Sequence, residues 1–544
     1  MNSTANLYNS SSSMDIAEGP VEDANKKPEK RKNFLVQALL RHYGETTCNI
    51  TPEQFEKEKF LIGQIKFNPI ILMPAAVLIQ FCCGSLYAWS VFNTPIDVAM
   101  SGDPKNAQAP VTFYIAVGMF GVSAATMGPW LERNGPKKAL ILSSSLFFLG
   151  NLLSSLAIYL KAIWLLYIGY GVIGGFGLGL GYISPVSPLQ KWFPNKRGMA
   201  AGLAVCGFGA GSIAIGKVIL PLINSVGLSL TFVVLGCCFF TAMVCVALLF
   251  RIPPPEYTTS SNSVDSIDKS SQPKLPEIKL TLIESIKSFD FLLLYIMFLA
   301  NAVFGLVVIS RLSNMITQLY AKDPDEAATI VSVNGALNLF GRLFFSTISD
   351  KIGRKACFLI MLTTQTIVVA TFPAYTEHRV YWAFLVCMFA LTMCYGGGFG
   401  VIPAFLADMF GSTNIGACHG IILTAWSIAG VGGGLTFTAI YNKQISYGWS
   451  IYDAYPYIIN SYWILAFVIA GLIAGVFVRT TLKDRLLPPV KGQWFRFRIF
   501  GKIVRIKRIS TFPEVEILSS KEYDDEWDKY WQALHAPANN IGVD

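Results

Sequence analysis

The amino-acid sequence predicts an all-α membrane protein with twelve transmembrane helices in two pseudo-symmetric six-helix halves. Hydrophobic residues make up 53% of the chain and charged residues only 14%, whereas charged residues make up about a quarter of a soluble domain. Apolar segments of roughly 20 residues, the length that crosses a bilayer as a helix, recur along the chain. They fall into two sets of six, which are separated by a polar segment and repeat one another in sequence.

The order of these segments divides the chain into five regions. Residues 1–67 form a polar N-terminal tail. Residues 68–251 form the first half, with helices expected at 68–92, 110–131, 138–160, 162–189, 198–222 and 226–251. Residues 252–287 begin with consecutive prolines and are rich in serine, so we expect a linker there. Residues 288–480 form the second half, with helices expected at 288–312, 326–348, 355–374, 380–406, 415–442 and 456–480, and residues 481–544 form a charged C-terminal tail.

The distribution of basic residues predicts the orientation of the chain. Short loops on one side of the predicted membrane carry nine basic residues, against five on the opposite side. The nine are Arg133, Lys137, Lys138, Lys191, Lys196, Arg197, Lys351, Arg354 and Lys355. Basic loops stay in the cytosol, so both termini are expected there, with the plasma membrane preferred over an organelle. These loops and the tails explain the net charge of +9. We therefore expect a lipid bilayer and no nucleic acid as the large partner.

One part of the C-terminal tail, residues 491–502, mixes basic and aromatic side chains. This composition fits a segment that lies on the anionic inner leaflet of the membrane. A solvated tail that only helps to fix the orientation of the chain is the alternative.

The two halves match at a constant offset of 218 residues. The aligned pairs include Glu132 with Asp350, Arg133 with Lys351, Gly135 with Gly353, Pro185 with Pro403, Gly198 with Gly416 and Gly202 with Gly420. An acidic-basic-x-Gly cluster and a proline in register, without a gap, indicate a duplicated unit. Two such halves suggest transport by alternating access, with the substrate held between them near the middle of the membrane.

Arg342 is a single cation inside an otherwise apolar predicted helix. The charged turn at Asp350 follows about 12 Å further along the helix axis, which places Arg342 near the middle of a hydrocarbon layer roughly 30 Å thick. An arginine at that depth costs about 2.5 to 3.5 kcal/mol, so it is expected to face a polar cavity and to have a function. No Asp or Glu lies deep in any predicted span, and Arg342 is the lone formal charge that we find at mid-depth. Its planar guanidinium suits a carboxylate ligand.

The remaining reactive residues do not indicate an enzyme. The eleven cysteines show neither metal-ligand spacing nor the pattern of a secreted disulfide framework. We find no nucleophile-base set, metal cluster or phosphate-binding loop. We therefore expect no metal, no cofactor and no covalent chemistry.

Two charged turns, residues 128–138 and 349–355, look like the cytoplasmic signature of the major facilitator superfamily. In such a turn an acidic residue at a helix end can face the positive N-terminus of a neighbouring helix. We therefore assign conformational gating to Glu132, Arg133, Asp350 and Arg354. Two positions depart from the signature: Glu132 replaces the usual Asp, and Ser346 stands where the second copy would carry Gly.

More specific segments are residues 79–92, with the sequence Ile-Gln-Phe-Cys-Cys-Gly-Ser-Leu-Tyr-Ala-Trp-Ser-Val-Phe, and residues 191–204, which begin Lys-Trp-Phe-Pro-Asn-Lys-Arg-Gly. Together with Arg342 in its Asn-Gly context, they resemble the oxalate/formate antiporter family, a near relative of the monocarboxylate transporters. The resemblance covers residues 68–480. It implies that Arg342 binds a substrate carboxylate.

Two departures from the related families bear on substrate and coupling. The family's oxalate transporter has a lysine in helix 11 within a Thr-Ala-Lys context, where this chain has Trp426. The missing charge favours a monocarboxylate over a dianion such as oxalate. Proton-coupled relatives place an Asp four residues before the helix 8 arginine, where this chain has Asn338. An amide cannot carry a proton, which favours exchange or facilitated movement; His419 and Lys217 are the alternative proton carriers, although we assign both to the membrane interfaces.

Further residues are candidates for the walls of the site. In helix 1, Gln80 and Tyr87 share one face, and the related family cages its anion with aromatic residues. Tyr87 is preferred over Trp89, which lies about 200° away on an ideal helix. Tyr182 is a further candidate, and Phe208 is the pseudo-symmetric mate of Trp426.

The sequence thus predicts a secondary transporter of small organic anions, such as formate, lactate or pyruvate, with oxalate less favoured. We expect it to work by exchange and to transport as a monomer. Two alternatives remain open: a proton-coupled symporter of another small solute, and a transporter-like receptor that binds its ligand without moving it.

Overall fold

The computed structural model describes the backbone of residues 34–44, 51, 53, 56, 58–60, 66–102, 108–254, 281–411, 413–480, 484, 487–499, 502–508 and 513–535. Most of the predicted N-terminal tail and of the linker lies outside these residues. The described residues from Tyr43 onward form one compact unit. Helix α1 (Phe34–Gly44), in the predicted N-terminal tail, begins in a separate unit.

Twelve helical segments within the described residues are long and apolar enough to span a membrane. The first half consists of η1 (Pro69–Ile71), α3 (Leu72–Gly84), η2 (Ser85–Trp89), α4 (Ser90–Ser101), α5 (Ala109–Asn134), α6 (Pro136–Leu160), α7 (Ile163–Leu166), η3 (Tyr167–Gly174), α8 (Gly175–Ile183), α9 (Val186–Trp192), η4 (Pro194–Lys196), α10 (Arg197–Val226) and α11 (Leu228–Ala247). The first four of these elements form one continuous span, and so do α7 to α9.

The second half begins with the short helix α13 (Leu282–Ile286), which lies inside the predicted linker. Its spans are α14 (Phe289–Leu319), α15 (Pro324–Ile352), α16 (Arg354–Glu377), α17 (Tyr381–Phe410), α18 (Ile415–Ile428) with η5 (Ala429–Gly433) and α19 (Gly434–Ser446), and α20 (Tyr455–Phe477). The predicted twelve-span fold is therefore confirmed. The largest differences are the first span, which runs on to Ser101, and α14, which runs on to Leu319.

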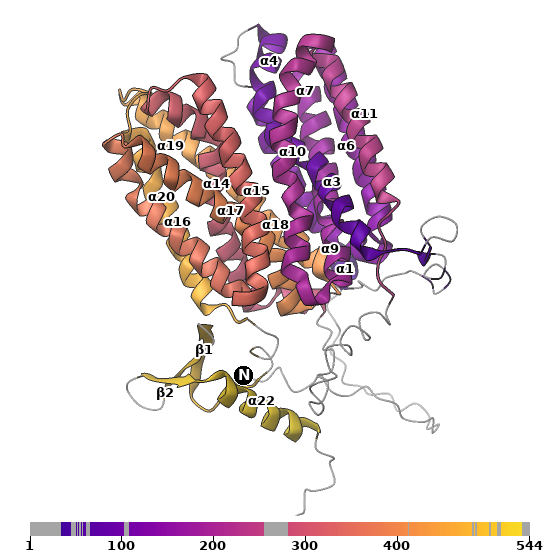
Figure 1. Ribbon diagram of the computed structural model, residues 1–544, viewed down its shortest axis with the longest axis vertical. Helices are drawn as coiled ribbons and strands as arrows, with labels where there is room; N and C mark the ends of the chain where they lie inside the picture. Colours follow the sequence, from indigo (N-terminus) through magenta and orange to yellow (C-terminus); the bar gives the residue numbers. More distant parts are fainter. Residues whose placement is uncertain are drawn as a thin grey trace, which may run out of the picture. The chain divides into compact units, whose positions relative to one another are not determined.

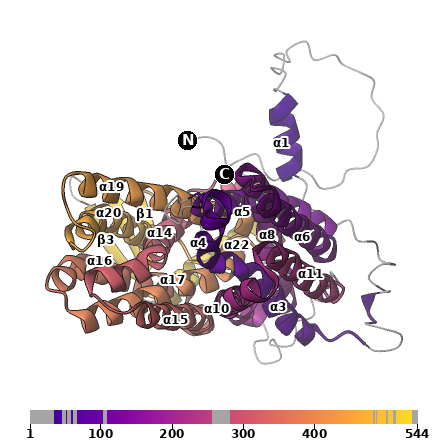
Figure 2. The same ribbon diagram turned by 90° about the horizontal axis from the view of Figure 1, so that it is seen from above.

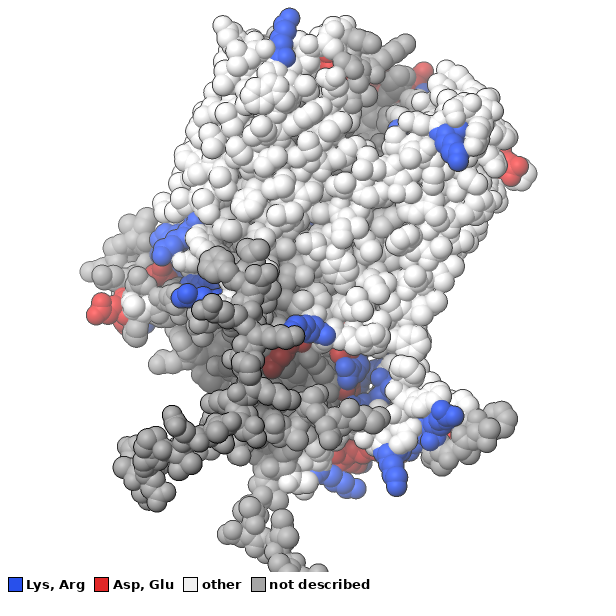
Figure 3. Space-filling model, turned by 180° about the vertical axis from the view of Figure 1, so that it is seen from behind, with Lys and Arg blue, Asp and Glu red and all other residues white. Residues whose placement is uncertain are grey.

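The two halves lie side by side (Figures 1 and 2). Helix α5 packs against α18, and α10 packs against α15, so each contact joins one half to the other. Lys, Arg, Asp and Glu gather towards the two ends of the helices and leave an uncharged band between them (Figure 3). We call the end that carries the turns at Glu132 and Asp350 the charged end, and the other the opposite end.

Two glycines make these contacts between the halves possible. A Cβ atom on Gly202 of α10 would lie 1.7 Å from the hydroxyl oxygen of Ser346, and one on Gly420 of α18 would lie 1.9 Å from the carbonyl oxygen of Ala124. Only glycine allows such a close approach of two helices. Because Gly202 and Gly420 are related by the repeat, the duplication predicted from the sequence appears as a matched pair of contacts between the halves.

The C-terminal tail has a structure that the sequence analysis did not assign. Strands β1 (Gln493–Ile499), β2 (Lys502–Arg508) and β3 (Pro513–Leu518) form an antiparallel sheet in the order β1-β2-β3, followed by α22 (Ser520–His535). Tyr523 and Trp527 of α22 form a small apolar cluster with Leu487 and Ile503. Phe477, at the end of the last span, contacts rings of β1, which connects the tail to the membrane helices.

Ion pairs hold the sheet and α22 together. The buried Arg505 guanidinium lies 3.1 Å from Glu516 and 2.5 Å from Glu526. Hydrogen bonds from Lys507 and Arg505 hold the pKa of the Glu516 carboxyl below its usual range. A lowered pKa in the folded state means that this contribution to stability is present at neutral pH and is lost as the pH falls through that pKa.

We predict that Trp527→Ala unfolds the tail while the spans stay intact. The Trp527 side chain is 2% exposed, and truncating a buried tryptophan costs about 3 to 5 kcal/mol, which a four-residue cluster cannot absorb. Limited trypsin digestion of the purified full-length protein should then cut the tail much faster than in the wild type. Trp494→Ala, at a position with 55% exposure, is the matched control; equal digestion of the two variants would contradict the prediction.

Candidate functional site

Arg342 lies in the middle of α15 and is 1% exposed. Its Nε donates a hydrogen bond of 3.0 Å to Oδ1 of Asn338, one turn earlier, and its Nη1 donates one of 3.0 Å to the carbonyl oxygen of Val205 on α10. The guanidinium carbon lies 5.4 Å from the ring centre of Phe208 and 4.9 Å from that of Phe399. Within the described part of the chain, Arg342 has no carboxylate in ion-pair contact. Its charge is therefore balanced only by dipoles and ring faces.

Aromatic side chains from both halves surround the guanidinium. With Arg342 they enclose a void of about 10 Å³, whose other lining residues are Tyr87, Phe120, Tyr182, Phe208, Phe399, Leu423 and Trp426. A void of that size holds about one water molecule. We call this set of residues the arginine cage. In this conformation it is too small for an organic acid.

A hydrogen-bond network closes one side of the arginine cage. The hydroxyl oxygens of Tyr87 and Tyr395 lie 2.8 Å apart, and Nε1 of Trp426 donates a bond of 3.1 Å to the Tyr395 hydroxyl. Tyr87 also packs edge-on against Phe208, with ring centres 4.8 Å apart. Since Tyr87 belongs to the first half and Tyr395 and Trp426 to the second, the network joins the halves at the site.

Tyr87 lies on the 3₁₀ segment η2, between α3 and α4. A short 3₁₀ stretch inside a long helix commonly marks a hinge. It also changes the side-chain directions that an ideal helix predicts. Tyr87 points to the cage, whereas Trp89 packs on Tyr170 in the core of the first half, with its Nε1 donating to the carbonyl of Ala109.

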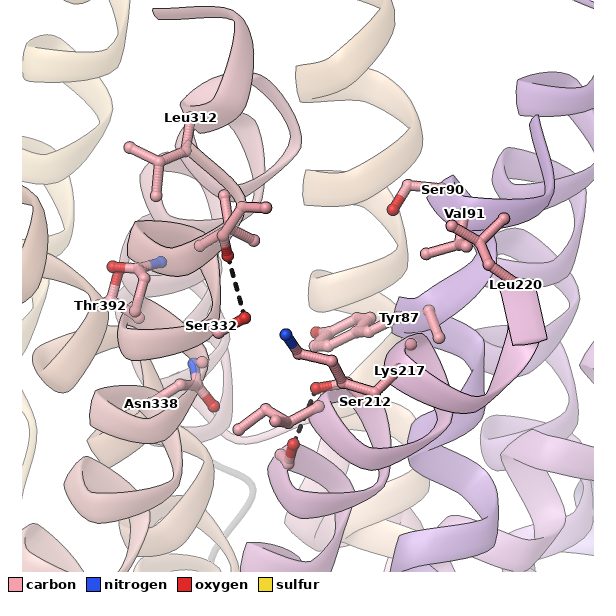
Figure 4. Close-up of a pocket in the computed structure, with 18 of the residues that line it drawn as sticks. Tyr87, Ser90, Val91, Ser212, Lys217, Leu220, Leu312, Ser332, Asn338 and Thr392 are labelled. Carbon is pink, nitrogen blue, oxygen red and sulfur yellow. Dashed lines mark hydrogen bonds between the residues drawn. The ribbon is translucent and has the colours of Figure 1, made fainter. Parts of the chain in front are cut away.

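A larger cavity of about 440 Å³ extends from the cage towards the opposite end (Figure 4). Tyr87 lines both spaces, and Asn338, the hydrogen-bond partner of Arg342, lines the larger one. Three of its buried polar atoms lack hydrogen-bond partners among the described residues: Asn334 Oδ1, Asn338 Nδ2 and Thr392 Oγ1. Buried polar atoms are normally paired, so these three atoms are exceptions among the residues that border the cavity.

At the charged end, Asp350 joins the second half to the first. Its two carboxylate oxygens accept hydrogen bonds of 3.0 Å from the backbone N–H groups of Gly198 and Met199, at the start of α10. Arg354 lies 2.6 Å from Asp350 and 3.0 Å from Asp408. The negative charge therefore meets both an arginine and the positive end of a helix of the other half.

Glu132 makes the pseudo-symmetric contact from the first half. Its Oε1 accepts a bond of 2.6 Å from the N–H of Gly416, at the start of α18, and one of 2.9 Å from the Ser187 hydroxyl. Its Oε2 lies 2.5 Å from Nζ of Lys191. Arg133 beside it is half-buried. Together the two carboxylates fasten the charged end, so the large cavity lies on the other side of a closed contact.

Other predicted site residues lie where the sequence could not place them. Gln80 is fully buried and donates a bond of 2.8 Å to the carbonyl of Tyr182, so it joins two spans of the first half and lines neither space. His419, assigned to an interface from the sequence, is instead 1% exposed inside the helices, and its ring centre is 5.9 Å from that of Tyr182. Lys217 is exposed and lines the large cavity.

Sequence reasoning missed several residues of this region. Phe120, Phe399 and Leu423 line the cage void, and Tyr395 belongs to the hydrogen-bond network beside it. An apolar or aromatic residue in an apolar run carries no signal that separates a site from ordinary packing. Arg311 is a further cation within a helix: its Nη2 donates a bond of 2.7 Å to Thr438, and its guanidinium lies over Phe437. Arg311 lies one residue before the predicted end of its helix, at residue 312, where a cation is ordinary; α14 continues to Leu319, which places Arg311 inside the helix.

Comparison with known proteins places the chain among membrane carriers. A family model described as "Major Facilitator Superfamily" matches residues 76–434 and 308–513. The "Uncharacterized MFS-type transporter YhjX" of Escherichia coli is 27% identical over 382 residues, 70% of this chain and 88% of that protein. The "Oxalate:formate antiporter" of Oxalobacter formigenes is 23% identical over 387 residues, 70% of this chain and 85% of that protein.

Two further similarities agree with this result. "Monocarboxylate transporter 12" of Xenopus laevis is 25% identical over 304 residues, 52% of this chain and 63% of that protein. The solved structure of the proton:xylose symporter XylE covers 75% of this chain and 94% of its own, with 16% identity and a TM-score of 0.57. At that identity the structural match supports the fold alone.

We predict that Asp350→Asn loosens the charged end. The variant loses the charge opposite the start of α10 and one of the two acceptors, and a hydrogen bond to a charged group contributes about 1.5 to 3 kcal/mol. The ratio of closed to open charged end should fall roughly ten- to a hundredfold. Spin labels at Lys138 and Lys287, one on each half, should report a larger population of long distances. Asp325→Asn, at the other end of α15, is the control; an unchanged distance distribution in Asp350→Asn would refute the gating role.

Proposed function

This chain belongs to the Major Facilitator Superfamily, and we propose that it carries small organic monocarboxylates across a membrane by alternating access. The observation that carries this proposal is the buried Arg342, which lies at the interface of the two halves without a carboxylate partner among the described residues. A substrate carboxylate would supply the missing negative charge.

The free donors of Arg342 support a carboxylate ligand. Of the five N–H donors of a guanidinium, the described hydrogen bonds use one on Nε and one on Nη1. One donor on Nη1 and two on Nη2 remain. These two nitrogens can bind both oxygens of a carboxylate in the two-point geometry that favours arginine over lysine.

The composition of the arginine cage supports a small monoanion. Arg342 is the only charged residue among those that line the void, and Trp426 fills the position where the related family carries a second cation. A second carboxylate would be buried among rings without a counter-charge, which is costly. Formate, lactate and pyruvate fit this description better than oxalate.

Exchange is the mode of transport that the site favours. The residue one turn before Arg342 is the neutral Asn338, and its Oδ1 is already used by the Arg342 Nε. No carboxylate lines the cage void, so proton transfer next to the bound anion has no acidic carrier there. Movement of a loaded carrier in both directions then requires that Glu132 and Asp350 release the N-termini of α18 and α10, and that the ion pair of 3.2 Å between Arg197 and Asp408 of the other half opens.

A proton-coupled symporter is the second candidate, and one observation favours it. Both ring nitrogens of the buried His419 lack hydrogen-bond partners among the described residues. A histidine in that position could take up a proton when the charged end opens. His419→Gln distinguishes the two modes, because it should abolish pH-driven uptake in a symporter and leave exchange intact in an antiporter.

We also propose which end of the protein faces the cytoplasm. Because basic loops remain in the cytosol, we place the charged end and both termini in the cytoplasm and the large cavity on the outer face. We further propose the plasma membrane as the location and the monomer as the transport unit.

We predict that Arg342→Gln reaches the membrane but loses saturable carboxylate exchange by about two to four orders of magnitude, since removing one partner of a buried charged pair costs about 3 to 5 kcal/mol. Arg342→Lys should be intermediate, because it keeps the charge and loses the planar fork. Counterflow of labelled formate, oxalate, lactate, pyruvate and acetate in proteoliposomes at several pH values measures both. Arg311→Gln is the control for loss of a helical cation. Wild-type exchange in Arg342→Gln would refute the role of Arg342 in carboxylate binding.

A further inference from the structure

The large cavity has a cation of its own. Lys217, on α10, lines it, and Figure 4 shows the Lys217 amino group directed into the space between the helices, towards Ser332. Within the part of the chain that the structure describes, no ion pair or hydrogen bond of the Lys217 side chain is found. None of the residues that line the cavity is Asp or Glu. Lys217 therefore gives an otherwise neutral cavity a positive charge.

Polar residues of the second half line the same cavity, and two of them carry buried atoms without hydrogen-bond partners among the described residues. Asn338 is 5% exposed; its Oδ1 accepts the bond from Arg342, and its Nδ2 is a buried donor without such a partner. The hydroxyl of Thr392, which is fully buried, also lacks a partner among the described residues. An ammonium, an amide N–H and a hydroxyl are three donors without acceptors, which is the complement of a carboxylate.

Arg342 does not line this cavity. The ring of Tyr87 and the Tyr87–Tyr395 hydrogen bond lie between the two spaces, and the cage void of about 10 Å³ admits no organic acid. An anion that enters from the opposite end therefore meets Lys217, Asn338 and Thr392 first. It reaches Arg342 only after Tyr87 has moved.

We propose that Lys217, Asn338 and Thr392 form an outer carboxylate-binding subsite, which the substrate occupies before Tyr87 admits it to Arg342. This inference rests on the proposed function, because it concerns the same substrate. Asn338 connects the two sites, because its Oδ1 accepts the bond from Arg342 and its Nδ2 is a donor without a partner among the described residues. Lys217 attracts anions into the cavity by its field, an effect that salt screens.

The outer subsite should affect substrate binding on one side of the membrane only. It faces only the cavity, so it affects binding from that side and has no part in binding from the charged end. Lys217→Gln should raise KM for uptake from the cavity side about five- to tenfold, with the maximal rate changed less than twofold. KM from the charged end should stay at the wild-type value. The dependence of the cavity-side KM on salt should weaken in the same variant.

The test compares uptake of labelled formate, lactate and pyruvate by cells with uptake by inside-out vesicles, for the wild type, Lys217→Gln and Lys217→Arg. Lys217→Arg should keep a KM near the wild type because it keeps the charge. Lys443→Gln, an exposed lysine of α19 that does not line the cavity, is the matched control. A KM unchanged in Lys217→Gln, or raised equally on both sides, would overturn the outer subsite.

A second variant guards against a folding defect. Lys217→Cys should show the same raised KM, and an aminoethyl methanethiosulfonate reagent, which restores a cation at this position, should return it towards the wild-type value. A negatively charged sulfonatoethyl reagent should not restore KM, and failure of the cationic reagent to rescue would also overturn the subsite.

If the wild type shows no saturable carboxylate uptake, the proposed function is refuted and the subsite with it. If the wild type transports and Lys217→Gln matches Lys443→Gln, only the subsite falls.

Discussion

A buried guanidinium without a carboxylate is the constraint on which the centre of this protein depends. Its charge must be stabilised by whatever surrounds it, and here that is one amide oxygen, one backbone carbonyl and two ring faces. These groups come from α10, α15 and α17, so the charge can be held only while helices of both halves lie close together. The groups that stabilise the Arg342 charge therefore also hold the two halves together. An anion that binds to Arg342 would change the packing between the halves as well.

The sequence predicted the fold and the central residue because both depend on contrasts that a sequence displays. Long apolar segments define the spans, and Arg342 is conspicuous because its neighbours are not charged. The aromatic surroundings were predicted only in part: Tyr87, Tyr182 and Trp426 were chosen, while Phe120, Tyr395 and Phe399 look like ordinary packing residues in an apolar helix. The sheet of the tail was missed because its mixture of basic and aromatic residues also suits a segment at a membrane surface, and strand pairing is a long-range property.

The repeat places one acidic residue of each half at a contact with the other half. Glu132 and Asp350 each bridge to a helix N-terminus of the other half, yet they do so with different chemistry. Both oxygens of Asp350 accept hydrogen bonds from the backbone of α10, and Arg354 forms an ion pair with this carboxylate. The oxygens of the longer Glu132 accept from Gly416 and Ser187 and pair with Lys191. The two contacts at the charged end are thus similar in position and unequal in composition.

The paired contacts at Gly202 and Gly420 have a mechanical consequence. Each brings a helix of one half almost against the backbone or a short side chain of the other, and the repeat relates the two contacts. Two such points define a line across the interface, and a rotation about that line leaves both contacts in place while it separates the halves at one end and brings them together at the other. In the proposed alternating-access cycle this line would act as the hinge axis, and the contacts of Glu132 and Asp350 at the charged end would open and close about it.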